Sequence, residues 1–359
     1  MDRLIVKNFG PLKDVDIELN KINLFIGENG SGKSVLGKLV TIIFSLHNLD
    51  KNFLNKFNDY HINFFRDETL ITYTRNKKIL MEIKNKSLFM DVSIQRGNFN
   101  LDYSSMASEL EKEIIDTDEF LNKFNYIKKI QDSITPQYIP AERNLISIFN
   151  KYVTTFITAD IPLPKFLLNF SSQYVRAREE IRELNLLNVK YKFQSDQERI
   201  FYNDKDYLLL EQSSSGIQSA LPLYLTIKYF AKKHHSIIIE EPEQNLFPKA
   251  QKETVEYIVE QISDENSLFM MTHSPYILTA LNNLILANDV KTQKGVDSIK
   301  GIVKEEQCVA FEDVSAYSLV DGKSISIMDK EERLIGVNLI DSISDEVSES
   351  FDRLLEKLD

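Results

Sequence analysis

The chain has 359 residues, and 43% of them are hydrophobic, which is enough for one large core or two smaller ones. Its formal net charge is −11, so the chain as a whole does not attract nucleic acid, and contact with DNA or RNA requires a local patch or a partner. The single cysteine, Cys308, excludes an intramolecular disulfide framework and is typical of a reducing cytosol. Without a signal-peptide pattern or an apolar run of membrane-spanning length, the sequence predicts a cytoplasmic protein without a membrane segment.

Alternating apolar and polar residues predict strands through much of the first 143 residues. The run from Ile22 to Ile26 is almost entirely apolar and predicts a buried strand. The helix predicted after it contains Val35, Leu36, Leu39, Val40 and Ile43. Residues 106–131 show helical spacing of apolar side chains. The strands predicted in this part of the chain are 3–8, 14–19, 22–26, 69–75, 78–84, 88–94 and 136–141.

Residues 144–187 are predicted to be mostly helical, and they separate the first group of strands from a second one at 188–195, 198–203 and 206–210. From residue 217 the pattern alternates helix and buried strand, which predicts an α/β fold with parallel strands. A closing helix is predicted at 343–358, where apolar residues recur at helical spacing.

The segment from Gly27 to Ser34 has the spacing Gly-x4-Gly-Lys-Ser of a Walker A phosphate loop. Its glycines allow backbone N–H groups to converge on phosphate oxygens, its lysine adds a positive charge, and its serine can hold Mg²⁺. A strand before the loop and a helix after it favour this interpretation over a chance glycine turn, because phosphate would then lie at a helix N-terminus. The residues predicted to bind the nucleotide here are Asn29, Gly30, Ser31, Gly32, Lys33 and Ser34.

A second turn of small residues, Ser213 to Gly216, precedes an apolar helix. Such a turn is either an anion site at a helix N-terminus or simply the N-cap of the helix. The residues alone leave both interpretations open.

Two buried strands end in polar residues. The run Ser236 to Ile239 leads into Glu240 and Glu241, and the run Ser267 to Thr272 leads into His273. In a parallel sheet the carboxyl ends of these strands lie beside the phosphate loop, at the edge where such folds bind ligands. Paired carboxylates there favour metal and water chemistry over a plain acidic turn.

Taken together, these motifs resemble the ABC-type ATPases of the SMC/RecF/OLD branch, and in particular the small AAA-family ATPases of bacterial anti-phage systems such as Septu PtuA and the PARIS ATPase. The resemblance covers residues 1–48 and 136–359 and is poor over 49–135 and 148–187. The segments that carry it are Ile5 to Gly10, Ile26 to Gly30, Tyr138 to Arg143, Glu240 to Glu243 and Thr272 to Pro275.

The resemblance implies ATP and Mg²⁺ as cofactors and assigns a role to each motif. Ser214 and Gly216 match the signature that caps ATP held by the opposite protomer, although Ser-Ser-Gly here departs from the Ser-Gly-Gly of transporters. Glu240 matches the acid that holds Mg²⁺ together with the loop serine. Glu241 matches the general base, and His273 matches the switch histidine that senses the γ-phosphate. The roles of three further residues stay open. Gln137 is either the Q-loop residue or a plain surface residue of a strand. Glu142 and Arg143 either face the nucleotide or a partner, or form a structural salt bridge.

The spacing of the motifs separates this chain from its longer relatives. Roughly 180 residues lie between Ser34 and Ser213, and they contain no sustained heptads that would build an SMC arm. We therefore expect an α/β ABC-type P-loop NTPase head in which a β-meander lobe and a short helical insertion replace the coiled-coil arm. The expected regions are an N-terminal ATPase lobe at 1–143, the helical insertion at 144–187 and a C-terminal ATPase lobe at 188–359.

The expected function is that of an ATP-hydrolysing switch. Two or more copies would assemble through composite ATP sites and control a separately encoded effector, expected to be a nuclease from an adjacent gene, in anti-phage defence. Nucleic acid would be reached through that partner, since no nuclease residues are visible in the sequence. The alternatives are a RecF-like DNA-repair ATPase that acts on DNA itself and, less well matched, a transporter subunit.

Overall fold

The computed structural model describes six segments of the chain with their side chains and the backbone of three short strands. The segments are 2–45, 55–84, 136–149, 163–233, 236–336 and 348–357, and the strands are β6 Ser87–Met90, β7 Ile94–Arg96 and β8 Phe99–Leu101. The helix expected at 106–131 lies outside the described residues. Among the described helices, none has the length and apolar character that crossing a membrane requires.

The fold is built on an eleven-stranded mixed sheet, which confirms the predicted α/β class. Its strand order is β6-β5-β4-β1-β2-β17-β16-β3-β15-β14-β9. One half is parallel, from β16 to β9, and the strands from β6 to β2 form an antiparallel wing. The bounds are β1 Asp2–Phe9, β2 Leu12–Leu19, β3 Ile22–Ile26, β4 Leu70–Arg75, β5 Lys78–Lys84, β9 Gln137–Ile139, β14 Ser236–Glu240, β15 Ser267–Thr272, β16 Val314–Val320 and β17 Lys323–Ser326.

The parallel half is the core of the molecule. Its central strands β3 and β14 are buried along their whole length, as their nearly continuous apolar sequences require. The pairing aligns Ile26 with Thr272 and Met271 with Glu240, so these strands end at the same edge of the sheet. The loops that follow β3, β14 and β15 therefore meet there, and these are the loops that carry the Walker A, acidic and histidine motifs.

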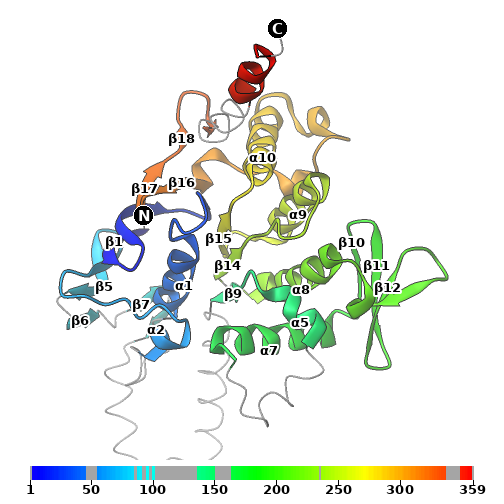
Figure 1. The fold of residues 1–359 in the computed structure, drawn as a ribbon, viewed down its shortest axis with the longest axis horizontal. Coiled ribbons are helices and arrows are strands. Elements are labelled where there is room, and N and C mark those ends of the chain that lie inside the picture. The colour runs from blue at the N-terminus through cyan, green and yellow to red at the C-terminus, as the bar shows by residue number, and fades with distance from the viewer. Residues whose placement is uncertain are drawn as a thin grey trace, which may run out of the picture.

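Helices cover both faces of the parallel strands. Figure 1 shows α1 (Lys33–Phe44) on one side of β14 and β15, and α9 (Pro248–Gln261) and α10 (Pro275–Lys294) on the other. Gly37 lets α1 approach closely, because a Cβ there would lie 3.0 Å from the Met271 side chain of β15.

A second group of elements packs beside β9 and β14. Helices α5 (Arg143–Phe149) and α7 (Lys165–Glu180) lie against α8 (Ser215–Phe230), and an antiparallel four-stranded sheet adjoins them (Figure 1). That sheet consists of β10 Glu183–Leu186, β11 Val189–Gln194, β12 Gln197–Phe201 and β13 Tyr207–Leu209. The remaining elements are α2 Asn55–Asp59, β18 Met328–Asp329, β19 Leu334–Ile335, a helix at 348–355 and the 3₁₀ turns η3 Leu210–Gln212, η4 Ala231–Lys233, η5 Val296–Ile299, η6 Glu305–Gln307 and η7 Phe311–Asp313.

One predicted boundary was wrong. The helical region expected to run to residue 187 ends at Glu180, because Leu184 and Leu186 alternate as buried residues of a hairpin strand. Of the strand expected at 88–94, the structure describes β6, which ends at Met90, and Ile94, which begins β7, and residues 91–93 lie outside the described residues. Strands from residues 1–143 and 188–359 interleave in one sheet, and we propose that these regions are two lobes of a single core.

Candidate active site

The phosphate loop leaves the carboxyl end of β3 and enters α1 through glycines that the geometry requires. Gly30 and Gly32 have φ angles of 81° and 102°, which side-chain-bearing residues rarely adopt. A Cβ on Gly27 would lie 2.5 Å from the main-chain oxygen of Leu319 in β16, so this turn is pressed against the neighbouring strand. Asn29, Gly30 and Ser34 are exposed, Ser31 is half-buried and Gly32 is buried.

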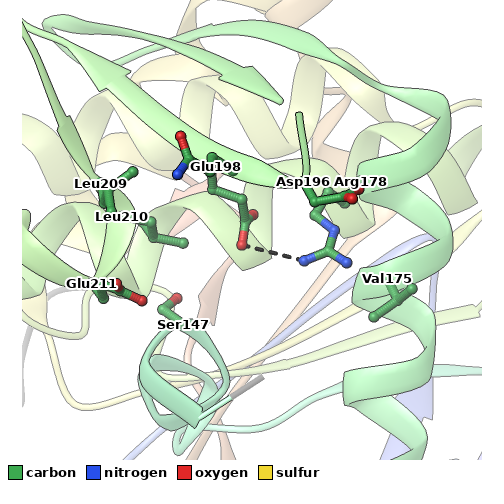
Figure 2. Close-up of a pocket in the computed structure, with 9 residues that line it drawn as sticks. Ser147, Val175, Arg178, Asp196, Glu198, Leu209, Leu210 and Glu211 are labelled. Carbon is green, nitrogen blue, oxygen red and sulfur yellow. Dashed lines mark hydrogen bonds and ion pairs between the residues drawn. The ribbon is translucent and has the colours of Figure 1, made fainter. Parts of the chain in front are cut away.

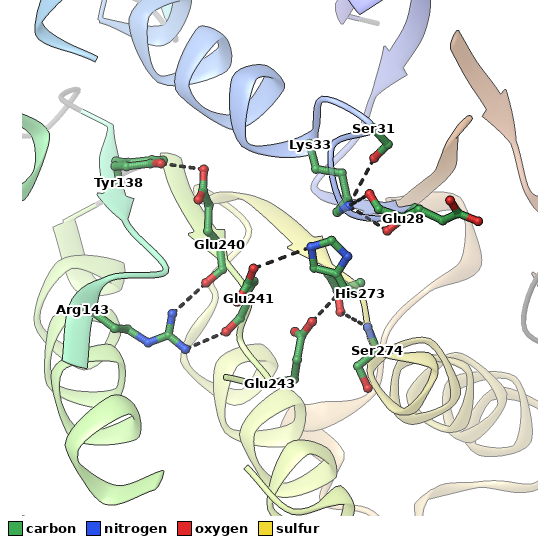
Figure 3. A network of polar contacts seen from close by, with 12 residues as sticks. Glu28, Ser31, Lys33, Tyr138, Arg143, Glu240, Glu241, Glu243, His273 and Ser274 are labelled. Atoms are coloured by element: carbon green, nitrogen blue, oxygen red, sulfur yellow. Dashed lines mark hydrogen bonds and ion pairs between the residues drawn. The ribbon is translucent and has the colours of Figure 1, made fainter. Parts of the chain in front are cut away.

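Lys33, the first residue of α1, points back into the loop. Its Nζ donates to the main-chain oxygens of Gly27 at 2.7 Å and Glu28 at 2.8 Å, and to Ser31 Oγ at 3.2 Å (Figure 3). The side chain is buried, and burial lowers its pKa to about 8 against the attraction of Glu241 and two neighbouring glutamates. A charged ammonium group at the centre of the loop is thus destabilised by desolvation, and phosphate oxygens would stabilise it.

Glu240 at the end of β14 is a buried carboxylate, only 4% exposed. Its Oε1 accepts a hydrogen bond of 2.6 Å from the Tyr138 hydroxyl, and Ser34 is near enough to help lower the pKa of the carboxylate. Burial raises the pKa of Glu240, while the hydrogen bond from Tyr138 and the charge of Lys38 lower it. The pair of Ser34 and Glu240 offers adjacent hydroxyl and carboxylate oxygens, the ligand type that Mg²⁺ prefers, so the residues present fit this cation.

Glu241 follows in a turn and is half-buried, with its carboxylate toward the space below the phosphate loop (Figure 3). Its backbone is left-handed, with φ 46°, and its N–H bonds to Met271 O at 2.8 Å. Its Oε1 lies 3.6 Å from Nε2 of His273, which begins the loop after β15. The predicted general base and the predicted switch histidine therefore face each other across two neighbouring strands.

A third glutamate of the same turn holds the histidine loop. Glu243 Oε1 accepts a hydrogen bond of 2.7 Å from the His273 backbone N–H. Its Oε2 is buried and has no hydrogen-bond partner among the residues that the structure describes. The sequence indicated this carboxylate only as part of the acidic run, because its contact with His273 depends on the register of β14 and β15.

The predicted signature turn lies at the start of α8. Ser214 is the N-cap residue and is exposed, whereas the hydroxyl of the buried Ser213 donates to Leu209 O at 3.1 Å. Position 216 requires glycine because the chain at Asn245 passes close to it: a Cβ on Gly216 would lie 2.9 Å from the main-chain oxygen of Asn245. The signature turn thus packs on the turn that carries Glu241, and within the described residues no hydrogen bond joins Ser214 to the phosphate loop of its own chain.

The structure narrows the alternatives left open at β9 and α5. Gln137 is buried and pairs with Ile237, three positions before Glu240, so it lies away from the edge that carries the site. Glu142 is exposed. Arg143 is buried, and in the described part of the chain its guanidinium bonds to main-chain oxygens rather than to a carboxylate, so the salt-bridge alternative is wrong.

The chain is similar to one protein family and to several solved structures. The profile of the family described as "AAA ATPase domain" matches residues 98–278. No curated protein matches the chain. Similar solved structures include an SMC head bound to the C-terminal winged-helix domain of ScpA, with 15% identity and a TM-score of 0.40 over 92% of this chain and 99% of that one.

Two further structures have comparable scores. An SMC head with an extended coiled coil, bound to the C-terminal domain of ScpA from Pyrococcus furiosus, has 14% identity and a TM-score of 0.41 over 97% of this chain and 100% of that one. An ATP-binding cassette of an ABC transporter in its ADP conformation has 14% identity and a TM-score of 0.39 over 93% of each chain.

Proposed function

The chain belongs to the AAA ATPase domain family, and we propose from that premise that it is an ATP-hydrolysing switch that assembles around ATP and controls a separate effector. The observation that carries the proposal is the convergence of four side chains at one edge of the parallel sheet. Lys33 begins the helix that follows β3, Glu240 and Glu241 stand at the end of β14, and His273 follows β15. These strands end at the same edge of the sheet, so the four side chains lie near one another there (Figure 3).

The arrangement supports phosphoanhydride hydrolysis by water. Backbone N–H groups of the loop and Lys33 would bind the β- and γ-phosphates of ATP. Ser34 and Glu240 would hold Mg²⁺, which supplies charge neutralisation to the phosphates. Glu241 would orient a water and accept its proton as the water oxygen attacks the γ-phosphorus and ADP leaves. His273, 3.6 Å from Glu241, would contact the γ-phosphate.

The exposed signature turn supports a site shared between two copies. Ser214 caps the 16-residue helix α8 from a position open to solvent. The free N-terminal N–H groups of such a helix favour an anion, so this surface can cap ATP held by the phosphate loop of a second protomer. A two-fold arrangement would form two equivalent sites.

A complementation experiment tests the shared site. Lys33→Ala and Ser214→Arg are each expected to be inactive as homodimers. A mixture contains heterodimers with one intact site, and random pairing with independent sites restores roughly a quarter of wild-type hydrolysis. Subunit exchange is checked with two affinity tags. Normal hydrolysis by Ser214→Arg alone would exclude the signature role, and no recovery after confirmed exchange would exclude an arrangement with independent shared sites.

The effector role rests on the resemblance to anti-phage ATPases and on the acidic charge of the chain, which does not favour direct binding to DNA. We expect the product of an adjacent gene to co-purify with this protein, and to bind differently to wild type and to a Glu241→Gln variant that retains ATP. The purified chain alone should not cut DNA or RNA. Tight, salt-dependent DNA binding by the chain alone would instead favour the DNA-repair alternative.

A further inference from the structure

We propose that Arg143 is a positioning residue that connects the signature helix α8 to Glu241, so that contact with a second protomer at Ser214 sets the geometry of hydrolysis. This inference rests on the proposed function, because it assigns a means of regulation to the same site. It concerns a residue that acts through its contacts with the main chain.

Arg143 stands at the junction of three elements. Its Nη1 donates to Glu240 O at 2.7 Å and to Pro140 O at 3.2 Å, and its Nη2 donates to Glu241 O at 2.6 Å. Its Nε donates to Ser219 O in the second turn of α8 at 3.0 Å. One planar group therefore holds the ends of β9 and β14 and the signature helix in a fixed relation. Figure 3 shows its contacts with Glu240 and Glu241.

The chemistry of this contact is costly for a purely structural role. Arg143 is 0% exposed, and burial lowers its pKa to about 10, so it stays charged at neutral pH. Nearby glutamates, Glu243 first among them, favour the charge, but among the described residues its hydrogen bonds all go to main-chain oxygens. Such a buried charge is a weak source of stability, and a close-packed apolar side chain would serve that purpose as well. The fork of five N–H donors provides something else, namely simultaneous fixed contacts to four separate oxygens.

The residue that Arg143 holds needs support. Glu241 has a left-handed backbone, which is unfavourable for a residue with a side chain, and such strain persists only where neighbouring contacts impose it. Its carbonyl accepts from both Arg143 and the Gln244 N–H at 2.9 Å. Loss of the guanidinium contact would therefore let the turn relax and move the Glu241 carboxylate.

The turn and the signature helix are also joined beside Arg143. Ser219 Oγ of α8 donates to Gln244 Oε1 at 2.9 Å. The approach of Gly216 to Asn245 O leaves no room for a Cβ. A displacement of α8 is consequently passed to residues 241–245 through Arg143 and Ser219 together.

The test compares Arg143→Lys and Arg143→Gln with the wild type. Lysine keeps the charge but has no planar fork, so it cannot reach all four carbonyls. We expect ATP affinity within about threefold of the wild type and a kcat per ATP-binding site lower by roughly tenfold to a hundredfold, the effect of misplacing a catalytic group by about 1 Å. ATP should still promote assembly, as in Glu241→Gln, because the nucleotide contacts are intact.

Arg178→Lys is the matched control. Arg178 also is a largely buried arginine; it bonds to Glu198 Oε2 at 3.4 Å and lines a pocket of about 210 Å³ that Ser147 of α5 also lines (Figure 2). Its contacts do not reach the turn of Glu241. The control should lower the melting temperature while leaving kcat per binding site unchanged. A merely structural Arg143 would behave in the same way, with activity falling only in proportion to the folded fraction.

The outcomes separate this inference from the proposed function. If the wild type hydrolyses ATP and Arg143→Lys matches its kcat within about twofold, the connection is wrong and the proposed function stands. If the wild type does not hydrolyse ATP, both are wrong. Should neither Arg143 variant fold, Ser219→Ala decides, because it breaks the second contact to the turn: a severalfold loss of kcat at unchanged ATP affinity supports the connection, and an unchanged kcat overturns it.

Discussion

The lowered pKa of Lys33 makes a quantitative prediction about the pH dependence of ATP binding. Burial lowers this pKa to about 8, so the ammonium group is mostly charged at pH 7 and mostly neutral at pH 9. Only the charged form attracts phosphate, and bound phosphates raise the pKa again. ATP affinity should therefore fall by about tenfold between pH 7 and pH 9, following the charged fraction of Lys33.

Isothermal titration with ATP-Mg²⁺ in two buffers of different ionisation enthalpy measures both the affinity and the protons taken up. Uptake should rise from near zero at pH 7 toward one proton per site at pH 9. The Lys33→Arg variant is the control, because its guanidinium stays charged and its affinity, whatever its value, should be constant over this range.

The stability of the fold depends on the titration of Lys33 in the opposite direction from ATP affinity. Because the folded-state pKa of Lys33 lies below its unfolded value, the contribution of Lys33 to stability rises between pH 8 and pH 10.5 while affinity falls. A constant wild-type affinity from pH 7 to pH 9, without proton uptake, would refute the placement of Lys33 against the phosphates.

Three further predictions follow from single contacts. Glu241→Gln should bind ATP normally but release phosphate roughly 10²-fold more slowly, since the base is lost; rapid phosphate release would move the base elsewhere. Gly27→Ala places a Cβ 2.5 Å from the main-chain oxygen of Leu319, so calorimetry should show ATP affinity at least about tenfold lower and a melt should show about 1–3 kcal/mol less stability. Tyr138→Phe removes a donor from Glu240 and raises the pKa of that carboxylate further, so half-maximal hydrolysis at pH 7 should need more Mg²⁺. That Mg²⁺ requirement should approach the wild-type value as pH rises, and a requirement that does not change would contradict the role of Tyr138.

Local patterns predicted the parts of the molecule whose conformation is determined by neighbouring residues. The strand Ile22–Ile26 and the helix after it were predicted within two residues of their observed bounds. The glycines of the loop predicted a phosphate-binding turn, because the left-handed backbone at Gly30 and Gly32 requires that residue type. Buried strands before Glu240 and His273 could also be predicted, since nearly continuous apolar runs are stable only in a sheet that is covered on both faces.

The wrong boundary lies where two local patterns compete. Glu183–Leu186 follows a helix and has polar neighbours, so its four residues are compatible with continued helix. Pairing with Val189–Gln194 decides in favour of a strand, and that pairing depends on a left-handed turn at Leu187, a residue type that rarely adopts it.

The sequence by itself determined the kind of ligand this protein is built for, because the phosphate loop, the paired acids and the histidine are short motifs with a chemistry of their own. Only the tertiary structure decided how these motifs act on one another. The contacts of Arg143 with Ser219, Glu240 and Glu241 join residues about 75 to 100 positions apart. They depend on main-chain oxygens, which every residue carries and which no sequence pattern can mark.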